Sequence, residues 1–188
     1  MKTLGLAVCG SFCTFEDLLP AAEALAQDYE LLPILSPAAF GTDTRFGLAA
    51  TFVKSLRELC GREPLTTIES VEPLGPRKLL DALIVAPCTG NTLGKLAAGI
   101  ADTAVTFAVK AHLRNQRPVI VAVSTHDGLA AAAENIGVLL NRKHYYFVPF
   151  GQDDPLGKPC SLKADLQKLP ETVAAALEGR QLQPLLLR

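Results

Sequence analysis

An uninterrupted apolar run, Ala82-Leu83-Ile84-Val85-Ala86, leads directly into a turn of small and polar residues, Pro87-Cys88-Thr89-Gly90-Asn91-Thr92. A strand-length run without a polar face predicts a β-strand that is covered by protein on both sides. Further strand-length runs follow the same pattern at residues 4–9, 30–35, 118–123 and 145–148. These runs predict a buried sheet of parallel strands.

Segments with helical periodicity separate the runs. They predict helices at residues 15–26, 44–60, 91–98, 103–113 and 128–140, and a helical tail at 161–178 that is interrupted at Pro170. Alternating strands and helices indicate an α/β fold: a three-layer, flavodoxin-like (Rossmann-like), doubly wound parallel sheet of five to six strands. We expect one domain over residues 1–188, with the C-terminal helical tail starting near residue 161.

Composition limits the possible partners. The chain has 188 residues, of which 49% are hydrophobic, so it can bury a substantial core. Its formal net charge is -1 and it has no tryptophan, which disfavours nucleic acids and anionic membranes as partners. Neither a signal peptide nor an apolar run of membrane-spanning length is recognisable, so the expected location is cytoplasmic.

The cysteines and acidic pairs do not predict a metal site. The five cysteines are odd in number and contain no CxxC pair, which favours reduced thiols over zinc binding. Asp153 and Asp154 offer too few oxygen ligands for a metal, so turn and interface roles are preferred for them.

Small polar residues follow four consecutive strands. They are Gly10 and Ser11 after the first strand, Ser36 after the second, residues 87–92 after the third, and Ser124 and Thr125 after the fourth. Ligands of open parallel sheets bind beyond the carboxyl ends of the strands, where helix N-termini attract anions. This ring therefore predicts a phosphate site, and because these turns contain no lysine or arginine, the donors would be uncharged.

The same residues also fit a purely structural role as helix caps and turn formers. Four of them at one edge favour the binding site, although any single one is better explained as a cap. No GxGxxG or GxxxxGK[ST] motif is present, which disfavours a common dinucleotide fold and a P-loop.

Residues 86–102 resemble the APxxxNTxxKxAxGIAD segment of the FMN-binding flavoprotein family, which includes phosphopantothenoylcysteine decarboxylases and lantibiotic cysteine decarboxylases. In that family the segment lies against the flavin, and Gly10-Ser11-Phe12 and Ser36 match its phosphate-side turns. The resemblance implies self-association, commonly as trimers with the flavin near an interface between subunits. It implies these cofactor-binding residues: Gly10, Ser11, Phe12, Ser36, Pro87, Thr89, Asn91, Thr92, Ser124 and Thr125.

Four further blocks, residues 9–15, 42–47, 110–118 and 147–155, resemble one branch of this family, so that the likeness covers nearly the whole chain. The branch acts with an A subunit that resembles nicotinamide-dependent oxidoreductases. The resemblance implies that the pair oxidises a dihydrodipicolinate-type precursor to dipicolinate, the pyridine dicarboxylate of bacterial endospores. It places the chain in the mother cell, with FMN as its own cofactor and NAD(P) on the partner.

Three functional alternatives remain open from the sequence. The chain is a catalytic oxidoreductase subunit, or it is a non-catalytic structural or activating subunit that retains no FMN. An FMN-dependent decarboxylase is disfavoured, because the decarboxylases carry PxMNxxMW after the fourth strand. This chain reads Val123-Ser124-Thr125-His126-Asp127-Gly128 there, and its only methionine is Met1.

A dicarboxylate substrate needs cationic partners. Arg114 and Arg117 are the candidate clamps, with Arg45 and Lys110 behind them, because the guanidinium fork matches a carboxylate. The alternative is a solvated, basic helix end.

Two residues are candidates for catalysis. His126 follows the fourth strand and could exchange a proton, and a helix N-terminus could activate the Cys88 thiol. The alternatives are a solvent-facing His126 and a buried, inert Cys88. His112 and His144 are expected in packing or surface positions.

Overall fold

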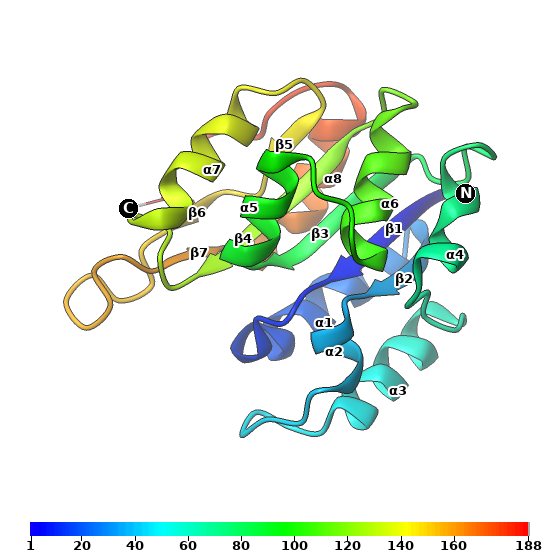
Figure 1. Cartoon of the computed structure of the whole chain (residues 1–188), viewed down its shortest axis with the longest axis horizontal. Helices are drawn as coiled ribbons and strands as arrows, with labels where there is room; N and C mark the ends of the chain where they lie inside the picture. The colour runs from blue at the N-terminus through cyan, green and yellow to red at the C-terminus, as the bar shows by residue number, and fades with distance from the viewer. Residues whose placement is uncertain (188) are drawn as a thin grey trace.

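A central sheet lies between two layers of helices in the computed structural model, which describes residues 1–187 (Figure 1). Five strands run parallel in the order β2-β1-β3-β4-β5. They are β1 Lys2–Val8, β2 Tyr29–Leu35, β3 Ala82–Cys88, β4 Val119–Thr125 and β5 Tyr145–Phe147. This strand order is that of flavodoxin, so the predicted flavodoxin-like fold is confirmed.

Helices cover both faces of the sheet. They are α1 Phe15–Ala26, α2 Pro37–Gly41, α3 Ala49–Cys60, α4 Ile68–Val71, α5 Gly90–Ala98, α6 Ala104–Leu113, α7 Ala131–Leu140 and α8 Leu169–Leu177, with 3-10 turns η1 Phe12–Thr14, η2 Glu72–Leu74 and η3 Leu166–Lys168. The α1, α3 and α8 helices pack on one side, and α5, α6 and α7 pack on the other (Figure 1). No helix in residues 1–187 is long and apolar enough to cross a membrane.

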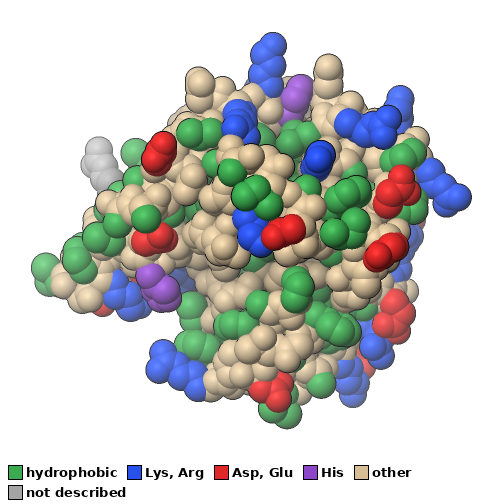
Figure 2. Space-filling model, in the orientation of Figure 1, with side chains coloured by type: hydrophobic (Ala, Val, Ile, Leu, Met, Phe, Trp, Pro, Cys, Tyr) green, Lys and Arg blue, Asp and Glu red, His purple; other side chains and the backbone are tan. Residues whose placement is uncertain are grey.

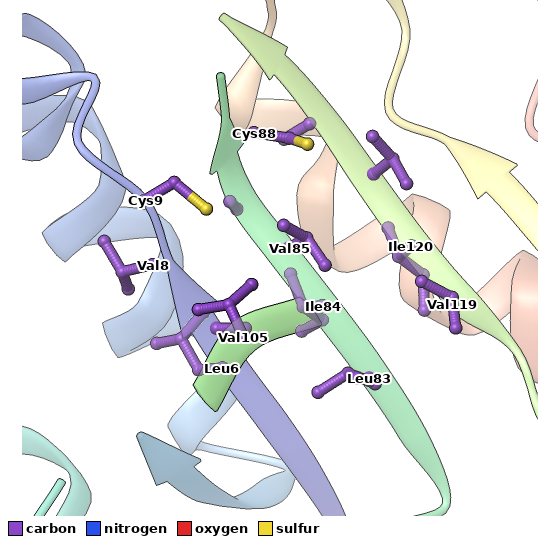
Figure 3. Close-up of a cluster of buried hydrophobic side chains, with 14 of the residues drawn as sticks. Leu6, Val8, Cys9, Leu83, Ile84, Val85, Cys88, Val105, Val119 and Ile120 are labelled. Carbon is purple, nitrogen blue, oxygen red and sulfur yellow. The ribbon is translucent and has the colours of Figure 1, made fainter. Parts of the chain in front are cut away.

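The core follows from the apolar strands. Every residue of β3 is buried, and side chains of β1 and β4 extend the same cluster on either side (Figure 3). A Cβ atom at Gly5 would overlap Leu83 Cδ1 and lie 2.8 Å from Leu80 Cδ1, so glycine leaves room for these two leucine side chains to pack over β1. Truncating a fully buried side chain such as Ile84 to alanine costs about 2–5 kcal/mol of stability. The core therefore fixes the strand ends, and with them the turns that follow.

Two short strands extend the sheet in a way that the sequence did not predict. The strands β6 Phe150–Gly151 and β7 Leu162–Ala164 are antiparallel, and β7 pairs with the end of β4 in the register Ser124↔Lys163 and Thr125↔Leu162. The expectation of helix from residue 161 is wrong for its first part, because β7 and η3 precede α8. The loop between β6 and β7 projects from the body of the molecule at the lower left of Figure 1.

Two predicted helix starts were also wrong. The helix expected from Thr44 begins at Ala49, because Thr44 and Gly47 exchange two backbone hydrogen bonds of 3.0 and 3.1 Å in a tight turn. Gly47 has φ 143°, which suits glycine, and Asp43 Oδ1 accepts from Ala49 N at 2.9 Å to cap α3. The helix expected from residue 128 begins at Ala131.

Candidate functional site

A cavity of about 330 Å³ opens at the carboxyl ends of the central strands, beside the switch point between β1 and β3. It gathers predicted residues from three strand ends: Gly10, Ser11, Phe12, Thr89, Ser124, Thr125 and His126. Figure 2 shows basic side chains and a histidine around the hollow between the projecting loop and the lower part of the molecule. Part of the predicted ring therefore lines a concavity, at the position where open α/β sheets bind ligands, whereas Ser36, Pro87, Asn91 and Thr92 do not line it.

Three hydroxyl groups form a closed cluster in this region, which we call the hydroxyl triangle. Ser11 Oγ lies 2.7 Å from Ser124 Oγ and 3.1 Å from Thr14 Oγ1, and Thr14 Oγ1 lies 2.9 Å from Ser124 Oγ. Ser11 and Thr14 are N-cap residues of η1 and α1, yet neither side chain makes a capping hydrogen bond. The hydroxyls are thus free to turn their protons toward a ligand, while the first N–H of α1, that of Phe15, donates to Phe12 O.

Two other members of the ring are caps. Ser36 Oγ accepts from Ala39 N at 3.2 Å at the start of α2, and Thr89 Oγ1 accepts from Thr92 N at 3.2 Å at the start of α5. Ser36 is not among the cavity residues, whereas Thr89 is. Ser36 and Thr89 therefore act as helix caps, and the hydroxyls that remain as candidates for ligand binding are those of the hydroxyl triangle.

The turn after β3 faces inward more than expected. Pro87 and Cys88 are buried in β3. The hydroxyl of Thr92 points inward and donates to Cys9 Sγ at 3.2 Å, so the prediction that this hydroxyl binds a ligand directly is wrong. Asn91 is exposed on α5 and does not line the cavity.

The prediction of a reactive Cys88 was wrong. Its side chain is fully buried, and both its sulfur and that of Cys9 lie among apolar side chains (Figure 3). Burial, followed by the neighbouring Cys9, raises the pKa of the Cys88 thiol well above its usual value. Burial also raises the pKa of Cys9 to about 11. A thiol in such surroundings stays protonated and is inert.

A carboxylate of the chain itself occupies the N-terminus of α5. Thr125 Oγ1 donates to Asp127 Oδ1 at 2.5 Å. Both atoms lie against the first residue of α5, because a Cβ atom at Gly90 would be 2.6 Å from Thr125 Oγ1 and 2.7 Å from Asp127 Oδ1. The partial positive charge of α5 is therefore already paired with Asp127. The donors that remain for an anion at this edge are therefore the hydroxyls of the triangle, because the first turn of α1 likewise carries two carboxylates, Glu16 and Asp17.

Arg114 and Arg117 lie at the wrong edge of the sheet. Arg117 Nη1 donates to Lys78 O at 3.0 Å and also to Leu80 O, and both arginines precede β4. The 7 residues of β4 separate them from the cavity by about 20 Å. Within one copy of the chain they cannot clamp a ligand there, so this prediction is corrected. Arg45 lies at the tip of the Thr44–Gly47 turn, with its guanidinium 4.9 Å from the ring centroid of Phe46, which lines the cavity.

Sequence reasoning missed two lysines. Lys158 and Lys163 line the cavity, so an anion there would not rely on uncharged donors alone. They come from a segment more than thirty residues beyond β4, which β7 returns to the edge of β4. The alternation of buried Leu162, half-buried Lys163 and buried Ala164 is the strand signal that could have found them.

The chain matches the Flavoprotein family model over residues 3–163 and belongs to this family. It is 42% identical to the B subunit of dipicolinate synthase from Bacillus subtilis (strain 168) over 187 residues, which is 99% of this chain and 94% of that protein. The crystal structure of the dipicolinate synthase B subunit from Bacillus halodurans C superposes with a TM-score of 0.91 and 38% identity, covering 100% of this chain and 96% of the other. The resemblance found from the sequence is confirmed.

More distant structures share the fold alone. The FMN-dependent cysteine decarboxylase SpaF has a TM-score of 0.69 at 21% identity, covering 95% of this chain and 96% of its own. Membership of the Flavoprotein family supports flavin binding by this chain.

Proposed function

We propose that this chain is an FMN-binding B subunit of dipicolinate synthase, which acts with an A subunit to oxidise a dihydrodipicolinate-type precursor to dipicolinate. The A subunit would contribute NAD(P), and the complex would work in the cytoplasm of the mother cell during sporulation. The observation that carries the proposal is the hydroxyl triangle beside the start of α1, of which Ser11 and Ser124 line the cavity at the β1/β3 switch point. The relatedness to the B subunit of dipicolinate synthase supports the reaction.

The donor set at this place suits a phosphate group. Ser11 and Ser124 supply hydroxyl donors at the cavity wall, the buried Thr14 hydroxyl bonds to both, and a Cβ atom at Gly10 would meet Ala38 Cβ at 3.0 Å. Hydroxyls and helix N–H groups bind a dianion without a buried counter-charge. When bound, FMN would supply an electron-accepting ring to the site.

An apolar hollow adjoins the cavity and suits the flat part of the same ligand. It has a volume of about 260 Å³, and Phe12 and Phe46 line both spaces. Phe15 and Phe52 stack at a centroid distance of 3.9 Å and form part of its wall. Aromatic walls next to a phosphate site match a ligand that has a charged end and a planar, apolar body.

We assign His126 to proton exchange, because it is the imidazole that lines the cavity and it is exposed to solvent. It follows β4 directly, so the same strand that holds Ser124 in the triangle positions it. The chain would self-associate as its family relatives do, with the interfaces between subunits near the flavin.

One observation favours the alternative of a non-catalytic, activating subunit. Two charged residues of the cavity, Asp153 and Lys158, have pKa values that are shifted away from neutrality. For Asp153, burial raises the pKa, but hydrogen bonds from Ser161 and Lys158 outweigh it and the net pKa is lowered. The pKa of Lys158 is raised by its hydrogen bond to Asp153. General acid–base catalysis uses groups whose pKa is moved toward neutrality instead.

A visible spectrum and an activity assay distinguish the two roles. The chain is purified alone and with the A subunit, and flavin absorbance is compared with protein concentration. About one flavin per chain, with loss of turnover when the flavin is stripped, supports the catalytic role. A colourless chain that still raises the turnover of the A subunit supports the activating role. A colourless chain without effect on the A subunit would refute both.

A further inference from the structure

Two lysine ammonium groups flank the hydroxyl triangle. Because Lys163 is paired with Ser124 across the antiparallel β7 and β4 strands, the two side chains share one face of the sheet. Lys163 Nζ reaches Asp17 Oδ2 at 2.7 Å on α1, the helix that starts at the triangle. Lys158 belongs to the projecting loop, and its Nζ lies 3.1 Å from Asp153 Oδ2. Both ammonium groups line the cavity and both are held by a carboxylate of the chain.

We propose that Lys158 and Lys163 form a second anion subsite, separate from the phosphate site, that binds the two carboxylates of a small dicarboxylate ligand. On binding, each lysine exchanges its carboxylate partner in the chain, Asp153 or Asp17, for a carboxylate of the ligand. The proposal rests on the proposed function for the identity of the ligand, and it replaces Arg114 and Arg117 as the residues that recognise its charge.

The ion pairs are of a kind that can exchange partners. The side chains of Lys158 and Lys163 are 53% and 36% exposed, and those of their partners Asp153 and Asp17 are 26% and 53% exposed. Water screens exposed ion pairs strongly, so breaking them costs little. Each exchange replaces one ammonium–carboxylate contact by another, and the released carboxylate remains in contact with water. Lysine suits this role because its long, flexible stem carries a compact charge that can swing between partners.

Charge decides which of two neighbouring cavities takes the ligand. A larger cavity of about 590 Å³ shares Asp153 and Lys163 with the site but adds the carboxylates Glu16, Asp17 and Asp165 to its lining. A dianion is repelled there. The smaller cavity has two ammonium groups against the single carboxylate of Asp153, and Arg45 lies beside its Phe46 wall. The dicarboxylate is therefore directed to the side of the hydroxyl triangle.

Calorimetric titration of the full chain tests the assignment, with pyridine-2,6-dicarboxylate and FMN as separate probes. Lys158→Gln and Lys163→Gln should each weaken dicarboxylate binding about tenfold or more, since each removes a charge-assisted hydrogen bond. FMN affinity should stay within about threefold. Lys54→Gln is the matched control, because Lys54 also forms an exposed ion pair, with Glu58 at 3.8 Å, but lies on α3 outside the cavity. It should change neither affinity.

The competing carboxylates give a second test that simple misfolding cannot imitate. Asp17→Asn and Asp153→Asn remove the internal partner, so dicarboxylate should bind more tightly than to the unaltered chain. Lys163→Arg should retain binding, because the charge is preserved. Unchanged dicarboxylate affinity in both glutamine variants would overturn the subsite, as would a loss confined to FMN, which would assign the lysines to the phosphate. If the chain binds no FMN at all, the proposed function fails while the dicarboxylate titration still decides this inference.

Discussion

The two edges of the sheet use polar side chains in opposite ways. At the amino edge, Arg117 donates to two carbonyl oxygens, His112 Nε2 lies 3.1 Å from Pro118 O, and Asn115 Nδ2 donates to Gly75 O at 2.8 Å. At the carboxyl edge, the hydroxyls of the triangle bond to one another instead of to backbone groups. Side chains that satisfy buried backbone groups are required by the fold, whereas side chains that satisfy each other can be redirected to a ligand.

This difference explains why basic residues at the amino edge misled the sequence interpretation. Arg114 and Arg117 have the right chemistry for a carboxylate, but the backbone carbonyls before β3 already use Arg117. Lys158 and Lys163, whose partners are carboxylates at the surface, remain exchangeable. The partners of a charged group, more than its type, indicate its role.

The largest expected effect lies at the amino edge and is a pH dependence of stability. Burial lowers the pKa of His112 from 6.5 to about 4 in the folded state. Below pH 6.5 the unfolded chain binds a proton that the folded chain does not, so stability falls as the pH drops from 6.5 toward 4. The loss approaches about 3 kcal/mol. Urea unfolding at several pH values measures it, and His112→Gln should remove this part of the slope.

Ser124→Ala serves as the control at the other edge, because it should leave the pH slope of stability as it is. An equal slope in the unaltered chain and in His112→Gln would show that His112 is not the titrating group.

Next in size is the effect of Gly90→Ala at the carboxyl edge. The new Cβ would meet Thr125 Oγ1 at 2.6 Å and Asp127 Oδ1 at 2.7 Å, so their hydrogen bond must shift. We expect a loss of about 1–3 kcal/mol in unfolding free energy, as for other overpacked sites. Gly137→Ala on α7 is the matched control: no atom lies within 4 Å of its Cβ position, and the better helix propensity of alanine should raise stability by up to about 1 kcal/mol.

The two glycine variants are compared by thermal or urea unfolding. If Gly90→Ala gained stability as Gly137→Ala is expected to, the close approach of Asp127 to α5 would not be a feature of the folded chain.

The third effect separates binding from stability. Ser124→Ala opens the hydroxyl triangle and removes one donor from the proposed phosphate site, so FMN affinity should fall about tenfold. Unfolding free energy should change by less than about 1 kcal/mol, because Ser11 and Thr14 still bond to each other at 3.1 Å. Fluorescence titration with FMN measures the affinity. An unchanged affinity would place the phosphate away from the triangle.

Much of this arrangement was predictable from local patterns, and the part that was not has a common cause. The five parallel strands follow from apolar runs, and the structure has them where they were expected. Turn chemistry predicts the small residues at their ends, of which Ser36, Asn91 and Thr92 do not line the cavity. Whether a hydroxyl caps its own helix, as Ser36 does, or bonds across the sheet, as Ser11 does, depends on side-chain direction. The antiparallel return of β7, which brings Lys163 to Ser124, is a long-range pairing of short segments. The direction of a hydroxyl leaves no periodic signal in the sequence, and β7 leaves only the three-residue alternation at residues 162–164.

The smallest expected effect tests the difference between hydroxyls that cap a helix and hydroxyls that are available to a ligand. Ser36→Ala removes the hydroxyl that accepts from Ala39 N at 3.2 Å, so α2 loses its cap and the chain should lose about 1 kcal/mol of stability. FMN affinity should remain within about threefold of the unaltered chain, in contrast to Ser124→Ala, because Ser36 does not line the cavity. Ser36→Asn, which keeps a capping side chain, should recover the stability. A tenfold loss of FMN affinity in Ser36→Ala that Ser36→Asn does not restore would mean that the hydroxyl after β2 binds the phosphate, and that capping and ligand binding share this group.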